Sequence, residues 1–289
     1  MSLILSASTK KIIDQILVKP SHAIMLIAPE GSGKASVVYY LAQNLLNLRT
    51  KKELINYPYL SEFKPVKDVI TIDNVREMIA KTRLTTTGEG KIRRIIYIED
   101  AHKMGHEAQN ALLKLLEEPP KDTCLILTVS DKKLMLPTVV SRVTSITINL
   151  PKKEQLDEHF KKLGYSAQQI EKNYLLSRGR PGVYTALLTD DQEHPLVQSI
   201  SNIKNLLSMT TNERLIFIDK PEFKNVDLAV LLDGFISICS VAISQASEKN
   251  NKNDIKRWLN LYKIACQTYD VKSAHPNTNL LFSNLVLSM

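Results

Sequence analysis

A strand, a glycine-rich loop and a helix follow one another near the start of the sequence and limit the folds open to the chain. Residues 23–27 read Ala-Ile-Met-Leu-Ile, a continuous apolar run typical of a buried strand. The loop at 28–35 reads Ala-Pro-Glu-Gly-Ser-Gly-Lys-Ala, and helical periodicity follows over 36–46. This order predicts a phosphate-binding loop inside an α/β domain.

The loop departs from the working phosphate-binding pattern, G-x-x-x-x-G-K-[S/T], at two positions. In that pattern backbone N–H groups and the lysine hold phosphate, and the final hydroxyl holds Mg²⁺. The phosphate-holding part is kept by Gly31, Ser32, Gly33 and Lys34. Ala28 replaces the leading glycine, and Ala35 has no hydroxyl to offer a metal. We therefore expect at most weak ATP or ADP binding, no required cofactor and poor hydrolysis.

Two acidic residues follow a second apolar segment. Residues 93–98 read Arg-Arg-Ile-Ile-Tyr-Ile and lead into Glu99 and Asp100. Ligands of α/β sheets bind at the carboxyl ends of strands, so this pair stands where a second acidic motif belongs. The usual order, Asp for the metal and then Glu for the water, is reversed. The pair is either part of a degenerate nucleotide site or a structural pair held by Lys34 or Arg93.

Alternating strands and helices predict a parallel sheet with helices on both faces. Further strands are expected at 124–128 and 143–148, and helices at 8–17, 73–84 and 103–118, while residues 49–68 are expected to form an irregular connector. From Pro151 onward only helical periodicity remains, with long helices expected at 227–247, 252–269 and 277–287. The organisation is thus an α/β domain, a small helical domain and a helical bundle.

Composition places few further limits on the function. The net charge of +8 lies mostly in residues 1–150, which permits a face near nucleic acid or simply a solvated basic surface. Cys124, Cys239 and Cys266 are too far apart for a disulfide framework or a metal motif, and we interpret them as buried thiols. The apolar stretch 228–243 is shorter than a membrane span and contains Asp233, which favours a bundle helix. We expect a cytoplasmic protein with no membrane partner.

The strongest family signal is the segment 110–120, Asn-Ala-Leu-Leu-Lys-Leu-Leu-Glu-Glu-Pro-Pro. Together with residues 98–104 and the Ser141-Arg142 pair, it resembles the clamp-loader branch of the AAA+ proteins. The stretch 274–288 is similar to the close of a bacterial clamp-loader collar. The resemblance covers essentially the whole chain. It implies a P-loop AAA+ core over 1–150, a helical lid over 151–192 and an all-α collar over 193–289 that joins a ring.

The same resemblance gives roles to two further residues. Ser141-Arg142 corresponds to the family's Ser-Arg-Cys motif, with Val143 in place of the cysteine. Arg142 is then an arginine finger that acts in trans on ATP bound by a neighbouring subunit; the alternative is an ordinary surface arginine. Thr128 corresponds to the sensor-1 position, where it either meets a phosphate or, the favoured interpretation, completes a strand.

Two departures from the family pattern also matter. In motor subunits the region around Gly179 supplies an arginine to the nucleotide, but here Gly182 falls at that position, while Arg178 and Arg180 flank Gly179. The four-cysteine zinc module of many bacterial relatives is missing, because residues 49–68 contain no cysteine. No zinc or other metal is expected.

These departures favour a stator, a subunit that does not hydrolyse ATP but joins the ring that loads the sliding clamp on primed DNA. The implied partners are gamma/tau-type clamp-loader ATPase subunits, the clamp-opening delta subunit, the sliding clamp and, through the assembly, primer–template DNA. One alternative is an ATP-hydrolysing motor of the gamma/tau type, which Gly31, Gly33 and Lys34 support. A third interpretation is an adaptor that senses ATP without hydrolysing it.

Overall fold

The computed structural model describes residues 3–219, 227–271 and 283–287, and its chain forms two compact units, Met1–Pro151 and Lys152–Met289. Residues 283–287 are helical. The rest of the helix expected over 277–287, and most of the collar-like motif at 274–288, lie outside the described residues. The division of the second unit into lid and collar at residue 192 stays a prediction.

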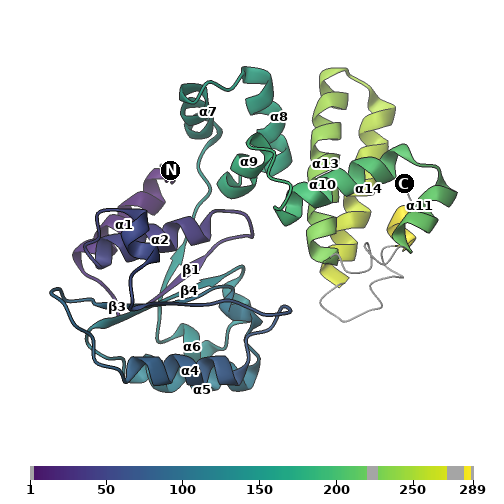
Figure 1. The fold of residues 1–289 in the computed structure, drawn as a ribbon. Helices are drawn as coiled ribbons and strands as arrows, with labels where there is room; N and C mark the ends of the chain where they lie inside the picture. The colour runs from purple at the N-terminus through teal and green to yellow at the C-terminus, as the bar shows by residue number, and fades with distance from the viewer. Residues whose placement is uncertain (1–2, 220–226, 272–282, 288–289) are drawn as a thin grey trace. The chain divides into compact units, whose positions relative to one another are not determined.

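A five-stranded parallel sheet forms the centre of the first unit (Figure 1). Its order is β2-β3-β4-β1-β5, and every neighbouring pair is parallel. The strands are β1 (Ala23–Ile27), β2 (Leu60–Phe63), β3 (Arg94–Ile98), β4 (Thr123–Val129) and β5 (Thr144–Thr147). Because parallel neighbours require crossover connections, helices separate most of the strands in the sequence.

Helices cover both faces of this sheet, as the sequence predicted. They are α1 (Ala7–Val18), α2 (Lys34–Leu45), α3 (Lys51–Ile55), α4 (Ile72–Thr82), α5 (His106–Glu117) and α6 (Pro137–Val140), with 3₁₀ turns η1 (Ala101–Lys103) and η2 (Lys132–Leu134). Side chains alternate along each strand, so Ile24 and Leu26 pack in the cluster with α1 and α2, whereas Met25 packs with α4 and α5. Figure 1 shows α1 and α2 on one side of the sheet and α4, α5 and α6 on the other.

The expectation of an irregular connector over 49–68 was wrong. This segment contains α3, capped by the Thr50 side chain, and the edge strand β2. An edge strand pairs on one side only, and three of the four residues of β2 are at least partly exposed, so its sequence lacks the apolar run of a central strand. The helix expected to be capped by Asp73 is capped two residues earlier, by Thr71 in a capping box with Asn74.

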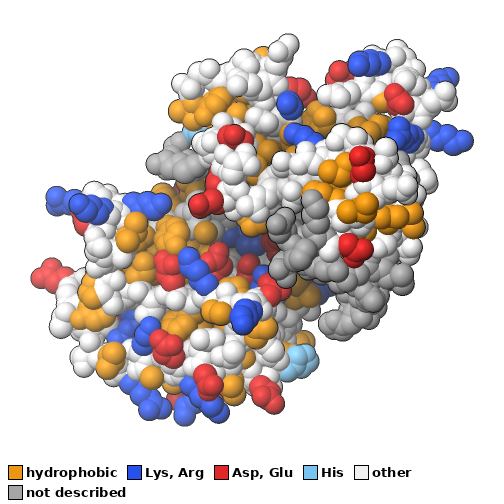
Figure 2. Space-filling view, turned by 45° about the vertical axis from the view of Figure 1, so that its right-hand side comes forward, with side chains coloured by type: hydrophobic (Ala, Val, Ile, Leu, Met, Phe, Trp, Pro, Cys, Tyr) orange, Lys and Arg blue, Asp and Glu red, His pale blue; other side chains and the backbone are white. Residues whose placement is uncertain are grey.

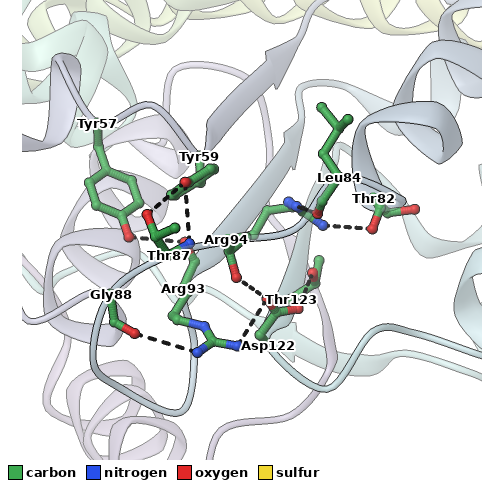
Figure 3. A network of polar contacts seen from close by, with 11 residues as sticks. Tyr57, Tyr59, Thr82, Leu84, Thr87, Gly88, Arg93, Arg94, Asp122 and Thr123 are labelled. Carbon is green, nitrogen blue, oxygen red and sulfur yellow. Dashed lines mark hydrogen bonds and ion pairs between the residues drawn. The ribbon is translucent and has the colours of Figure 1, made fainter.

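A polar network fixes the amino-terminal end of β3 (Figure 3). Arg94 is buried and donates to the carbonyl oxygens of Thr82, at 2.8 Å, and Leu84. Arg93 lies 3.5 Å from a carboxylate oxygen of Asp122. Arg93 is therefore engaged at the opposite end of the strand from Glu99 and Asp100, and of the two alternatives for the partner of those acids, Arg93 was wrong.

The second unit is helical throughout its described residues. Its helices are α7 (Lys153–Lys162), α8 (Ala167–Ser177), α9 (Pro181–Leu188), α10 (Pro195–Ser208), α11 (Thr211–Ile218), α13 (Leu228–Glu248) and α14 (Lys252–Val271). Phe235 and Leu232 of α13 pack with residues of α10 and α14 in one buried cluster. Among the described helices, α13 alone is long and apolar enough to cross a membrane by length and composition, and half of its most apolar window is buried inside the structure.

The cysteines are free thiols, in agreement with the absence of a disulfide pattern. Cys124 and Cys239 are buried, and burial raises the pKa of each thiol to about 12. Cys266 is only partly buried, so the expectation that all three are buried was wrong for this residue.

Candidate functional site

The loop after β1 has a backbone suited to holding an anion. Gly31 and Gly33 adopt φ values of 72° and 86°, in the left-handed region that glycine enters at little cost. Gly33 is also the N-cap of α2 and contributes no side-chain hydrogen bond to the first turn of the helix. Amide groups at such a helix start are ready donors to a phosphate.

Lys34, the loop lysine, is bound by its own chain. Its Nζ donates to the Ala28 carbonyl oxygen at 2.8 Å and lies 3.9 Å from Asp100 Oδ1. The residue is only 8 % exposed. Burial lowers the pKa of Lys34, and the neighbouring carboxylates, Asp100 foremost, oppose that shift. The positive charge is thus compensated internally, as one of the two interpretations of the acidic pair predicted for Asp100.

Asp100 is held in an uncommon backbone conformation by Thr128. Its φ of 45° lies in the left-handed region, which aspartate tolerates better than most residues. The Asp100 N–H donates to Thr128 Oγ1 at 3.0 Å, and Thr128 is fully buried at the end of β4. Lys103 Nζ lies 3.9 Å from Asp100 Oδ2 and also contacts the carboxylate of Asp68. Asp100 therefore lies between two lysines.

Glu99 is engaged elsewhere. Its carboxylate lies 3.6 Å from the Nζ of Lys64, which directly follows the edge strand β2. Sequence reasoning missed Lys64, because the strand that places it was not predicted. It also missed Lys103, although a lysine three residues after an acid at a helical turn was an available signal. The two acids therefore serve different ion pairs.

The residues of the loop fit the phosphate of the nucleotide that this type of loop implies, but not its Mg²⁺. The Ser32 hydroxyl is buried and has no hydrogen-bond partner among the described residues, and the amides of the loop are suited to phosphate. A phosphate would have to draw Lys34 away from Ala28 and Asp100. The residues do not fit the accompanying Mg²⁺, since Ala35 offers no oxygen. Within the described ranges, no three His, Cys, Asp or Glu side chains group so as to hold a metal ion.

Arg142 lies at the surface, just after α6. Its side chain is 37 % exposed. Its Nε and Nη2 lie 3.0 and 2.7 Å from Glu117 Oε1, and its Nη1 donates to the Thr138 carbonyl oxygen at 3.0 Å and to Ser141 Oγ at 3.2 Å. Glu117, which sequence reasoning did not single out, is itself 51 % exposed. Arg142 is thus ordered by contacts that solvent and other ligands can reach.

The two arginines beside Gly179 are used inside the second unit. Arg178 Nη1 lies 2.8 Å from Asp233 Oδ1, and Arg180 pairs with the other carboxylate oxygen while its Nε donates to the Ser177 carbonyl oxygen. These pairs explain why an acid interrupts the apolar sequence of α13. They also engage both arginines that flank Gly179.

The parallel sheet, the glycine loop after β1 and the acids after β3 define an α/β P-loop domain, followed by a helical part. Comparison with protein families agrees. The model of the family described as DNA polymerase III, delta subunit, matches residues 8–152. The chain belongs to this family, and its curated relatives are named DNA polymerase III subunit delta'.

These relatives are distant and longer than the aligned region. The Pseudomonas aeruginosa protein is 28 % identical over 204 residues, covering 65 % of this chain and 62 % of the relative. The Haemophilus influenzae protein is 27 % identical over 55 % of this chain and 53 % of the relative, and the Escherichia coli protein is 25 % identical over 59 % and 55 %. The chain therefore spans about half to three-fifths of the length of these three relatives.

Two solved structures of Thermotoga maritima proteins align with most of this chain. A DNA polymerase III gamma subunit-related protein aligns with a TM-score of 0.49 at 18 % identity, covering 96 % of this chain and 97 % of that protein. The RuvB Holliday junction branch migration motor aligns with a TM-score of 0.47 at 14 % identity, covering 87 % and 84 %.

Proposed function

We propose that this chain is a non-hydrolysing, delta-prime-type subunit of a bacterial clamp loader that supplies Arg142 in trans to ATP held by a neighbouring subunit. The observation that carries the proposal is the contrast between two cations. Lys34, which would serve the chain's own site, is buried and compensated by Asp100. Arg142, which would serve another subunit, is exposed and ordered at the surface.

Three features of the chain's own site oppose hydrolysis. Ala35 removes the hydroxyl that would hold Mg²⁺. Glu99, the residue at the first acidic position, is paired with Lys64. Asp100, at the position that should orient water, is placed between Lys34 and Lys103. These contacts weigh against the gamma/tau-type motor, which remains the alternative that the intact glycines and lysine favour.

One observation favours the adaptor that binds nucleotide without hydrolysing it. The buried Ser32 hydroxyl lacks a hydrogen-bond partner among the described residues, and a phosphate oxygen would supply one. Weak ATP or ADP binding is compatible with the stator function, because binding without Mg²⁺ placement produces no turnover. Neither zinc nor another cofactor is required in this proposal.

The proposed partners are gamma/tau-type ATPase subunits, the delta subunit and the sliding clamp, in the bacterial cytoplasm and without a membrane. Primer–template DNA is reached through the assembly. On the face drawn in Figure 2, basic side chains lie among acidic ones and do not gather into a single basic patch.

The test is ATP hydrolysis by a clamp-loader complex reconstituted with partner subunits from the same organism. Arg142→Ala should lower DNA-dependent ATPase of the partner subunits substantially, since an arginine finger contributes about 10³–10⁵ in rate at a single site in other NTPases. Arg142→Lys is the matched control: it keeps the charge but loses the planar fork, and should also be impaired. Unchanged hydrolysis with Arg142→Ala in an intact complex would overturn the proposal.

A further inference from the structure

The side chain of Glu117 occupies the edge of the Arg142 guanidinium that is formed by Nε and Nη2. We infer that Glu117 is a positioning residue, an anion that holds Arg142 at the surface until a phosphate oxygen of a neighbour's nucleotide replaces it. This inference rests on the proposed function of Arg142 as a finger in trans.

The hydrogen bonds of the guanidinium carry the argument. Arginine has five N–H donors, and it binds carboxylate or phosphate best through two parallel N–H groups on one edge. Nε and Nη2, one such edge, both contact Glu117 Oε1 at 3.0 and 2.7 Å. On the other edge, Nη1 donates to the Thr138 carbonyl oxygen and to Ser141 Oγ. Within the described residues neither edge is free, so a two-pronged phosphate contact requires an exchange.

The Glu117 contact is the one suited to exchange. The Thr138 carbonyl and the Ser141 hydroxyl belong to the same short segment as Arg142 and move with it. Glu117 lies on a different element, α5, and is half-exposed. A carboxylate and a phosphate are both anions that prefer the same fork, so they exclude each other by geometry and by charge.

The position of Glu117 in its helix also favours a contact with a basic side chain. It is the last residue of α5, where the helix dipole favours cations and disfavours carboxylates. A basic side chain placed against that carboxylate offsets the local cost. The arginine therefore offsets the unfavourable interaction of the Glu117 carboxylate with the helix dipole. The carboxylate in turn keeps the Arg142 side chain ordered.

The buried side chain of Gln109 links the segments that precede α5 and α6. Gln109 of α5 donates to the Met104 carbonyl oxygen at 3.0 Å and accepts from the Leu136 N–H at 2.8 Å, next to the start of α6. Gln109 thereby joins the segments before α5 and before α6. Arg142 is able to change partners by rotating its side chain, while the backbone that carries it stays in place.

The experiment is steady-state ATP hydrolysis by the reconstituted complex carrying Glu117→Gln. This variant keeps the size of the side chain and an acceptor oxygen but removes the competing charge. An exposed ion pair is a modest competitor, so we expect the apparent KM for ATP to fall about two- to fivefold with kcat unchanged. Glu118→Gln, which removes the same charge one residue away, is the matched control and should leave KM unaltered.

A second readout uses the isolated chain and does not depend on ATPase. In wild type, the Nε–H of Arg142 should give a shifted NMR resonance that is protected from solvent exchange, and Glu117→Gln should move it toward the exposed value. Glu118→Gln should leave it in place. A resonance that is unmoved by Glu117→Gln would show that the contact is not made in solution and would overturn the inference.

The two proposals fail in different ways. If Arg142→Ala leaves partner ATPase unchanged, the finger itself is wrong. If Arg142→Ala lowers the rate but Glu117→Gln leaves KM as in wild type, or raises it, the finger stands and the competition by Glu117 is wrong. In the double variant Glu117→Gln/Arg142→Ala, the KM effect should disappear, because the two residues act through one contact.

Discussion

Lys34 and Arg142 are two cations of the same α/β unit with opposite surroundings. Lys34 is 8 % exposed and is bound by a backbone carbonyl of its own loop and by Asp100. Arg142 has a 37 % exposed side chain, and its acidic partner is half-exposed. The first cation is part of the chain's internal structure, whereas the second is presented to whatever approaches the surface.

Under the proposed stator function, the difference is that between a nucleotide-binding loop kept for its structure and an arginine kept for a neighbouring subunit. The positive-φ glycines, the lysine and the buried threonine still fix the loop and the acids next to it. The Lys34 Nζ and the Thr128 hydroxyl now bind partners within the chain itself. The comparison predicts that changes at Lys34 and Asp100 alter stability, whereas changes at Arg142 alter the activity of partner subunits.

The largest effect on stability is expected from Asp100→Asn, which removes the carboxylate facing Lys34 and tolerates the left-handed backbone. Breaking an ion pair that is mostly buried leaves a cation poorly compensated, and we expect a loss of about 1–3 kcal/mol in the free energy of unfolding. Urea denaturation measures it. Glu99→Gln is the matched control: its partner Lys64 is exposed, so the loss should stay below about 1 kcal/mol. Equal losses would contradict the internal role of Asp100.

A second prediction uses the lowered pKa of Lys34. At pH values between the lowered pKa of Lys34 in the folded chain and its ordinary pKa of 10.5, Lys34 is protonated in the unfolded chain and deprotonated in the folded chain. Lys34 therefore makes stability rise with pH across this alkaline window. Denaturation of wild type and Lys34→Met at several pH values isolates the effect from tyrosine and cysteine ionisation. The stability of wild type relative to Lys34→Met should increase with pH, and a flat or falling difference would show that Lys34 is not desolvated.

The smallest effect on stability is expected from Arg142→Ala. Its ion pair with Glu117 is exposed, and such pairs contribute about 0–1 kcal/mol. Thermal or urea unfolding of the isolated chain should change accordingly little. A loss of several kcal/mol would mean that Arg142 serves the fold, and the comparison with Lys34 would no longer hold.

Much of the fold was predictable because central strands carry continuous apolar sequence. β1, β3 and β4 were recognised in this way, and the loop glycines and the change of character near Pro151 followed from local pattern. β2 was missed because an edge strand is half polar, and Lys64 was missed with it. Arg142 was found through its motif. Its partner Glu117 was not, because a contact between residues 25 positions apart depends on how α5 and α6 pack.

The most direct measurement compares Lys34→Met and Arg142→Ala in one assay, ATP hydrolysis by the reconstituted clamp-loader complex with clamp and primed DNA. Each variant is first checked for incorporation into the complex. The stator account predicts that Lys34→Met leaves hydrolysis within about twofold of wild type. Arg142→Ala should lower the total rate by the fraction of hydrolysis that takes place at the neighbouring site served by the finger. Loss of hydrolysis with Lys34→Met and none with Arg142→Ala would contradict it.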